Sequence, residues 1–100
     1  MKTFGELTWD DAMYSVTADG VVRKHIIHGI QDYHFTNEIK FRFTDGSRSL
    51  KFNKDFKGYA DDYGTMYFAN AEDTLSYLND IADTANKVVQ NCLESLKLFN

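Results

Sequence analysis

The sequence predicts an α+β fold, in which an antiparallel meander of four to five short strands precedes one long C-terminal helix. Two Asp-Gly pairs lie between alternating apolar and polar residues, which is typical of β-hairpins. The proline-free run Asn70–Asn100 repeats apolar residues at helical spacing. We expect a single domain over residues 1–100, with the β-meander at 1–69 and the helix at 70–100.

The first hairpin is expected to turn at Asp19-Gly20, after an edge strand or short turn at residues 4–9. A three-residue loop with Gly20 in the left-handed conformation sets Val16 opposite Val22. A two-residue loop mixes apolar and polar side chains, so we favour the longer one. The favoured register places six apolar side chains on one face, which we expect to be the inner one: Ala12, Tyr14, Val16, Val22, Ile26 and Ile30.

The second hairpin is expected to turn at Asp45-Gly46 with a two-residue loop. Its inner face is then mostly apolar, with Ile39 opposite Phe52, Phe41 opposite Leu50, and Phe43 opposite Arg48. Its outer face carries Lys40 opposite Lys51, and Arg42 opposite Ser49.

The rest of the β-region is less regular. Residues 54–67 are expected to form a loop rich in tyrosine, and Met66–Ala69 a short strand that leads into the helix. A strongly curved meander of this kind is a small SH3-like open barrel, whereas a flatter one is a sheet with a helix across one face. We favour the barrel.

Apolar or small residues form a stripe along the predicted helix: Ala71, Leu75, Leu78, Ala82, Ala85, Val89, Cys92, Leu96 and Phe99. Asn70 is placed to cap its first turn. A helix of about 28 residues is about 42 Å long, whereas a 100-residue domain is only about 35 Å across. The helix should therefore extend beyond its own domain, bend or find a partner. We expect either a homodimer through Val89, Cys92, Leu96 and Phe99, or a bent helix that buries Leu75, Leu78, Ile81 and Ala82 on the barrel.

Several segments carry a resemblance to a group of known proteins. These are the run from Leu7 to Val16, the Asp19-Gly20 turn, the run Ile39–Gly46 and the run Tyr67–Asp73. Together they resemble short uncharacterised bacterial and phage proteins that pair an SH3-like barrel with a terminal helix. The resemblance implies this fold and a phage or mobile-element context, and it implies no catalytic residue.

Composition limits the setting and the kind of partner. The single cysteine excludes an internal disulfide, and no signal peptide or membrane span is recognised, so we expect a cytoplasmic protein without membrane contact. The net charge of −4 is unevenly distributed: −3 over residues 1–22, +4 over 23–57 and −5 over 58–100. A basic middle therefore lies between acidic ends.

Chemistry-bearing motifs are sparse in this sequence. His25 and His28 point to opposite faces of a strand, so together with His34 they are not expected to bind a metal. The pairs Asp10-Asp11 and Asp61-Asp62 are explained by turns. Because no phosphate-binding loop or nucleophile motif is present, we expect no enzyme activity, no cofactor and no small-molecule substrate.

Two hypotheses for function follow from the charge pattern. The first is a self-associating, non-enzymatic interaction module whose basic β-face (Lys40, Arg42 and Lys51) contacts an anionic partner, either a nucleic-acid backbone or an acidic protein. The alternative is a phage inhibitor or adaptor of the anti-defence type. It would bind a basic host protein through its acidic ends and a tyrosine-rich loop, Tyr59, Asp61, Asp62, Tyr63 and Tyr67.

Overall fold

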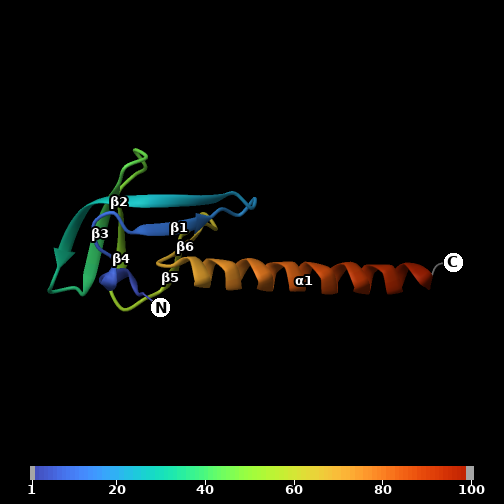
Figure 1. Ribbon diagram of the computed structural model, residues 1–100. Helices are drawn as coiled ribbons and strands as arrows, with labels where there is room; N and C mark the ends of the chain where they lie inside the picture. Colours follow the sequence, from blue (N-terminus) through green and yellow to red (C-terminus); the bar gives the residue numbers. More distant parts are fainter. Residues whose placement is uncertain (1, 99–100) are drawn as a thin grey trace.

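The computed structural model describes residues 2–98 as a six-stranded antiparallel sheet, curled into a nearly closed barrel, followed by one long helix (Figure 1). The elements are η1 (Phe4–Glu6), β1 (Ala12–Val16), β2 (Val22–Tyr33), β3 (Glu38–Phe43), β4 (Leu50–Asn53), β5 (Gly58–Ala60), β6 (Met66–Phe68) and α1 (Ala71–Lys97). Across the sheet the strand order is β4-β3-β2-β1-β6-β5. The expected α+β fold class is confirmed.

The predicted register of the first hairpin is confirmed, and that of the second is confirmed from Ile39 to Phe41 but not at the expected pairs Arg42–Ser49 and Phe43–Arg48. Val16 pairs with Val22 across the first hairpin, and Gly20 has a φ of 90°, which places it in the left-handed conformation that a bulged three-residue loop needs. In the second hairpin Phe41 pairs with Leu50, and Lys40 pairs with Lys51. Strand pairing stops there, so residues 44–49 form a longer loop than the two-residue turn expected.

Up to the bulge between Ile27 and Gly29, the inner face of the first hairpin is the opposite of the one predicted. Beyond the bulge Ile30 packs against the core as predicted, and Val16 is buried although it alternates onto the outer face. Met13 and Ile27 are fully buried in the barrel, whereas Val22 is exposed. Ser15 and His25 share the inner face and are hydrogen-bonded to each other there. Counting apolar residues selected the wrong face because the burial cost of these polar side chains is offset by that hydrogen bond.

The barrel core is aromatic and is closed at one end by η1. Nine buried residues form it: Phe4, Leu7, Met13, Ile27, Ile39, Phe41, Phe43, Phe52 and Ala69. The Phe4 ring stacks on Phe52 with centroids 4.1 Å apart. Phe4 N–H donates to the Phe56 carbonyl at 2.8 Å, which ties η1 to the chain between β4 and β5. Of the two options for the amino-terminal segment, the short turn is the one formed.

One strand lies in the segment that was expected to be a loop. β5 pairs with β6 through Tyr59 opposite Tyr67, so the sheet has six strands rather than four or five. This strand is only three residues long, a half-buried glycine followed by two exposed residues. Its sequence therefore lacks the apolar alternation by which strands are recognised.

α1 starts on the barrel and then leaves it. The Asn70 side chain caps the helix by accepting a hydrogen bond from Asp73 N–H at 2.8 Å. Thr74 is buried, and the Tyr77 ring packs against Phe68 on the outer face of β6. Every residue of the range 79–98 is exposed, and the helix projects straight away from the barrel (Figure 1).

This projection excludes the bent helix, one of the two alternatives expected for the helix. The molecule measures 62 × 26 × 23 Å, so the helix does extend beyond the barrel as its length predicts. The bent helix is wrong, since Leu75 is 59% exposed and Ile81 is 45% exposed. Phe99 lies outside the described residues. Among the residues described, no helix has both the length and the apolar character needed to cross a membrane.

Candidate functional site

The basic β-face lies on the outside of the barrel, over β2, β3 and β4. Ile39, Phe41 and Phe43 are buried in the core, so the alternation of β3 turns Lys40 and Arg42 outward. Across the ladders, Lys40 lies opposite Gln31 on β2 and Lys51 on β4. The structure therefore brings together the three cations that the sequence assigned to this face.

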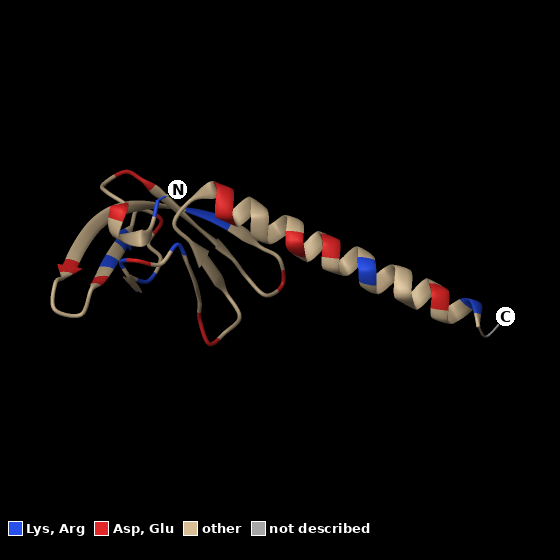
Figure 2. Ribbon diagram, turned by 90° about the horizontal axis from the view of Figure 1, so that it is seen from below, with Lys and Arg blue, Asp and Glu red and all other residues tan. Residues whose placement is uncertain are grey.

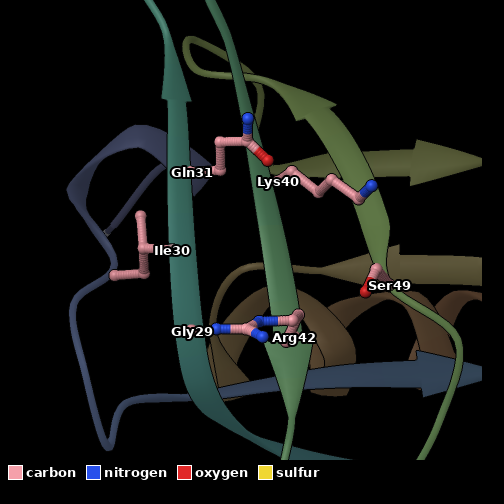
Figure 3. A pocket seen from close by; sticks show the side chains of 6 residues that line it. All are labelled: Gly29, Ile30, Gln31, Lys40, Arg42 and Ser49. Atoms are coloured by element: carbon pink, nitrogen blue, oxygen red, sulfur yellow. The ribbon is translucent and has the colours of Figure 1, made fainter.

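A shallow hollow of about 370 Å³ lies on this face, lined by Gly29, Ile30, Gln31, Lys40, Arg42 and Ser49 (Figure 3). The Arg42 side chain extends over β2 toward Gly29, and Lys40 extends over β4 (Figure 3). A Cβ atom at Gly29 would lie 2.6 Å from Arg42 Nε, too close for any real contact. The glycine therefore gives the guanidinium room to lie flat on β2.

The three cations differ in how far carboxylates compensate them. Lys51 Nζ lies 3.9 Å from Glu38 Oε1 and 5.1 Å from the centre of the Tyr33 ring, in a cation–π arrangement. Within residues 2–98, neither Lys40 nor Arg42 forms an ion pair. Lys40 and Arg42 are thus the better placed of the three to bind an added anion.

A second, smaller hollow of about 190 Å³ contains a feature that the sequence analysis missed. At its floor Ser15 Oγ lies 2.8 Å from His25 Nε2, and His25 Nδ1 lies 2.8 Å from Asp45 Oδ2. The Asp45 carboxylate also accepts from Ser47 N–H at 2.9 Å. The hydrogen bonds from Ser47, followed by the one from His25, lower the pKa of Asp45 to about 2.

This Ser–His–Asp arrangement has the order of a hydrolase triad, but its surroundings do not support nucleophilic catalysis. Ser15 and His25 are only 4% and 5% exposed. Ser15 lies in the middle of β1, which is paired on both sides, so the strand's amides are engaged in ladders rather than grouped as an oxyanion hole. We conclude that the relay fixes the β3–β4 loop to the sheet.

The signal for this relay was present in the predicted register. With Val16 opposite Val22, Met13 lies opposite His25 and Ser15 opposite Arg23. Ser15 and His25 are then diagonal neighbours on one face, within reach of each other. Asp45 could not be added from the sequence, because its position depends on the path of the β3–β4 loop.

The tyrosine-rich loop does not form one surface. Tyr67 is half-buried, and its ring packs edge-on against the core residue Phe52, with the ring centroids 5.7 Å apart. Burial, with the nearby Asp61 carboxylate, raises the pKa of Tyr67. Asp61 itself holds the turn by accepting from Tyr63 N–H and Thr65 N–H, both at 2.9 Å.

Two tyrosines of this loop keep exposed rings, and they differ in their contacts. Tyr59 is partly exposed and packs edge-on against Phe52 at 5.9 Å. Tyr63, at the tip of the turn with Asp62, is 81% exposed. Only the tip of the proposed protein-binding loop is therefore free.

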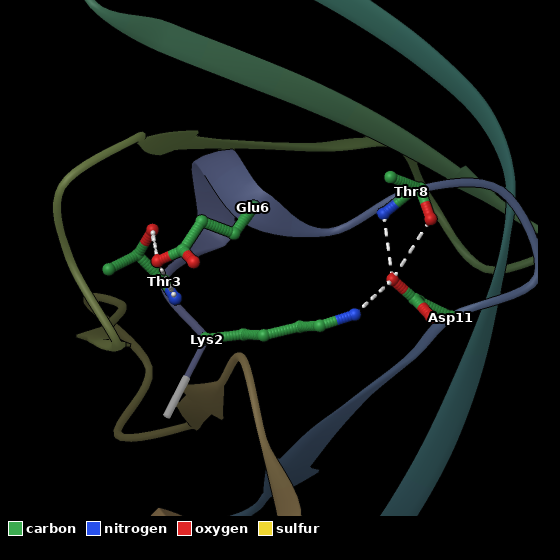
Figure 4. A network of polar contacts seen from close by, with 5 residues as sticks. All are labelled: Lys2, Thr3, Glu6, Thr8 and Asp11. Atoms are coloured by element: carbon green, nitrogen blue, oxygen red, sulfur yellow. Dashed lines mark hydrogen bonds and ion pairs between the residues drawn. The ribbon is translucent and has the colours of Figure 1, made fainter.

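The acidic amino-terminal segment is held by local contacts. Asp11 accepts from Thr8 N–H at 2.9 Å and from Lys2 Nζ at 3.1 Å, and these bonds lower the pKa of Asp11 (Figure 4). The Glu6 carboxylate accepts from Thr3 N–H at 3.2 Å, which completes a capping box around η1 (Figure 4). Asp11 therefore acts as a turn residue, the role assigned to it from the sequence.

The three histidines lie apart. His25 is in the core relay, His28 packs edge-on against Trp9 at 6.0 Å, and His34 lies 3.5 Å from Asp32 at the far end of β2. Over residues 2–98, no group of three or more His, Cys, Asp or Glu side chains is arranged to hold a metal ion.

The helix residues assigned to self-association are exposed on one side of α1. Val89, Cys92 and Leu96 fall on the described part of the stripe, and Cys92 is a free thiol. An apolar groove of about 390 Å³ runs beside them, lined by Val88, Asn91, Cys92, Ser95 and Leu96. A second groove of about 370 Å³ lies nearer the barrel, lined by Tyr77, Asp80, Ile81, Thr84 and Ala85.

Comparison with protein-family models, with curated proteins and with solved structures finds no match to this chain. The resemblance to short bacterial and phage proteins therefore stays a hypothesis about its context.

Proposed function

We propose that this protein is a non-enzymatic interaction module that self-associates through α1 and holds a nucleic-acid backbone on its basic β-face. The observation that carries the proposal is the unburied stripe of α1. Leu75, Val89 and Leu96 are all more than half exposed, although they repeat at heptad positions. A cytoplasmic setting is part of the proposal, because Cys92 is an exposed thiol.

Physical chemistry supports a partner for this helix. Isolated helices gain little stability in water from propensity alone, and most helices are stabilised by packing an apolar face. The stripe continues for about five turns beyond the contact of Tyr77 with the barrel, and Ile81, Val88 and Leu93 widen it. A second copy of the chain presents the same stripe and covers it by knobs-into-holes packing.

The donor set of the first hollow supports phosphate as the anion. The Arg42 guanidinium offers a planar pair of N–H donors that matches phosphate oxygens. Lys40 adds a second charge, and the Gln31 amide and the Ser49 hydroxyl add neutral donors from either side. Because the aromatic residues of β3 point into the core, they are not available to stack on bases. We expect binding that is salt-dependent and independent of sequence.

The rival function, inhibition of a basic host protein, has less support. It needs an acidic surface joined to a tyrosine patch, but Tyr67 is part of the barrel packing and only the tip at Tyr63 projects. If the rival function holds, removal of positive charge from the basic β-face should leave partner binding intact, whereas in the proposed function it should weaken binding. One binding experiment therefore separates the two functions.

The test compares binding of a labelled 30-nucleotide single strand to the wild-type chain and to a Lys40→Gln/Arg42→Gln variant. We expect weaker binding by the variant, with the slope of log affinity against log salt lowered by about 0.7 per lost contact. The matched control is Lys24→Gln with Lys57→Gln, which removes the same charge from exposed positions that do not line the hollow. Equal loss in both variants, or no loss in either, would overturn the basic β-face as the binding site.

An acidic peptide serves as the second probe in the same experiment. If polyglutamate binds and the nucleic acid does not, the partner class is an acidic protein and the phosphate assignment is wrong. If neither binds at low salt and micromolar protein, the basic β-face binds no anion of either class.

A further inference from the structure

We infer that two copies of α1 pair antiparallel, with the two-fold axis between Ala82 and Ala85, so that the two barrels lie at opposite ends of the dimer. This inference rests on the proposed self-association through α1 and adds its direction and register. Three features carry it: the charge along the helix, the sizes of the stripe residues and the position of the barrel.

Charge is distributed unequally between the two halves of α1. The half next to the barrel carries Glu72, Asp73, Asp80 and Asp83, and the far half carries Lys87, Glu94 and Lys97. Their net charges are −4 and +1, and Figure 2 shows most of the red bands in the half next to the barrel and, in the far half, two blue bands with a red band between them. A parallel pair sets −4 beside −4, whereas an antiparallel pair sets each acidic half beside a weakly basic one.

The helix dipoles favour the same direction. Each helix carries partial positive charge at its N-terminus and partial negative charge at its C-terminus. Antiparallel neighbours place unlike ends together. The effect is modest, but it adds to the side-chain charges rather than opposing them.

Residue sizes along the stripe fix the register. With the axis between Ala82 and Ala85, the layers are Leu75 opposite Cys92, Leu78 opposite Val89, and Ala82 opposite Ala85. The small pair at the centre lets the helices approach closely, and each leucine faces a smaller side chain.

The barrel leaves room for this arrangement. It covers α1 only over the first two turns, where Thr74 is buried and Tyr77 packs on Phe68. Leu75, on the adjacent side of the same turns, is 59% exposed. The far end of the second helix can therefore lie along Leu75 beside the barrel.

The native cysteine makes the direction measurable by oxidative cross-linking of the full chain. In the inferred dimer the two Cys92 residues are 17 positions apart along the axis, about 25 Å, and a disulfide needs Cα atoms within about 7 Å. We therefore expect no disulfide dimer from the wild type. Leu75→Cys should give a cross-linked dimer, and peptide mapping by mass spectrometry should find the bond between positions 75 and 92.

The control is Leu75→Cys combined with Cys92→Ser, which leaves one cysteine per chain at position 75. It should not cross-link in an antiparallel dimer, because its two thiols are again about 25 Å apart. Efficient cross-linking of both the wild type and this control shows a parallel pair, and cross-linking of only one of them shows an antiparallel pair centred on that cysteine. Either result overturns the inference. Failure of Leu75→Cys to form the 75–92 bond overturns the register.

Sedimentation of the reduced wild-type chain distinguishes failure of the inference from failure of the proposed function. A dimer that cross-links in the parallel pattern refutes only the antiparallel direction. A monomer at 100 µM refutes self-association itself, and the antiparallel pair with it.

Discussion

At the scale of single residues, the most consequential contacts are those of polar side chains inside or beside the barrel. His25 is buried between the Ser15 hydroxyl and the Asp45 carboxylate, and it joins β1, β2 and the β3–β4 loop. Because Gly29 has no side chain, it leaves space for the Arg42 guanidinium. The Ser15–His25–Asp45 relay thus stabilises the barrel, and the lack of a side chain at Gly29 determines the shape of the candidate site.

Stability should fall in acid partly through Asp45. Its pKa is lowered from 3.8 to about 2, so the folded state favours the ionised carboxylate. This contribution is complete above about pH 4 and is lost as the pH falls toward 2, because the unfolded chain then binds the proton more readily. Asp45→Asn should therefore destabilise the protein at pH 7 and much less at pH 2.5, as measured by urea denaturation.

The comparison for that experiment is Asp62→Asn, which removes a carboxylate at an exposed turn. Its effect on the free energy of unfolding should be small at both pH values. If Asp45→Asn lowers the free energy of unfolding by the same amount at pH 7 and pH 2.5, the charge on Asp45 does not contribute to stability.

Gly29→Ala should change the site without changing its charge. The new Cβ meets Arg42 Nε at 2.6 Å, so the flexible guanidinium must lift away from β2. We expect a small change in stability, and weaker nucleic-acid binding with an altered salt dependence, measured by fluorescence anisotropy. Unchanged binding would mean that the flat position of Arg42 is not the one that holds the anion.

At the scale of elements, the two hairpins follow from turn chemistry and alternation, which is why their registers could be predicted. The residues that face the core could be predicted for the second hairpin, where one face is apolar. They could not be predicted for the first, because Ser15 and His25 are made compatible with burial by a hydrogen bond that sequence periodicity does not record. β5 was missed because three residues carry too little periodicity.

The same limits apply to the candidate sites. The three cations of the basic β-face could be placed together from one register, since neighbours across a ladder share a face. The hollow between them depends on Gly29 and on the β2–β3 pairing, which shifts between Ile27 and Gly29. The position of such a bulge depends on how β2 and β3 pair in the folded sheet, so it could not be predicted from the sequence.

Two neighbouring residues of β3 should respond oppositely to substitution. Phe41 is fully buried, so Phe41→Ala should cost about 3–5 kcal/mol of unfolding free energy. Lys40→Glu should be close to neutral, because its side chain points outward opposite Lys51 and reversal of its charge removes a repulsion. Urea denaturation of both variants checks the order, and a larger loss for Lys40→Glu would contradict the observed alternation.

At the scale of the whole molecule, the protein is a barrel with a projecting helix rather than a compact globule. Comparing helix length with domain size predicted this from the sequence, whereas the direction in which α1 leaves the barrel depends on the Tyr77–Phe68 contact. The barrel and the exposed part of α1 share few contacts, so their stabilities should be separable.

Val89→Asp combined with Leu96→Asp should dissociate the dimer and leave the barrel folded. Two charges in the stripe have no compensating partner there, so the outer turns of α1 should lose helicity. Sedimentation should then report a monomer, and circular dichroism at 222 nm should fall while the tertiary signal of the barrel aromatics persists. Gln90→Asp with Asn91→Asp, which adds the same charge away from the stripe, should remain dimeric.

The strand order also has a consequence for how fast this chain folds. Within the sheet, the pairings β1–β2, β2–β3, β3–β4 and β5–β6 each join strands that are adjacent in sequence. The single exception is β1 with β6, where Tyr14 meets Phe68 across more than half the chain. Closing so long a loop carries the largest entropic cost of any pairing in this sheet. The hairpins can therefore form early and locally, and the rate of folding is set by the one ladder that joins the two ends of the barrel chain.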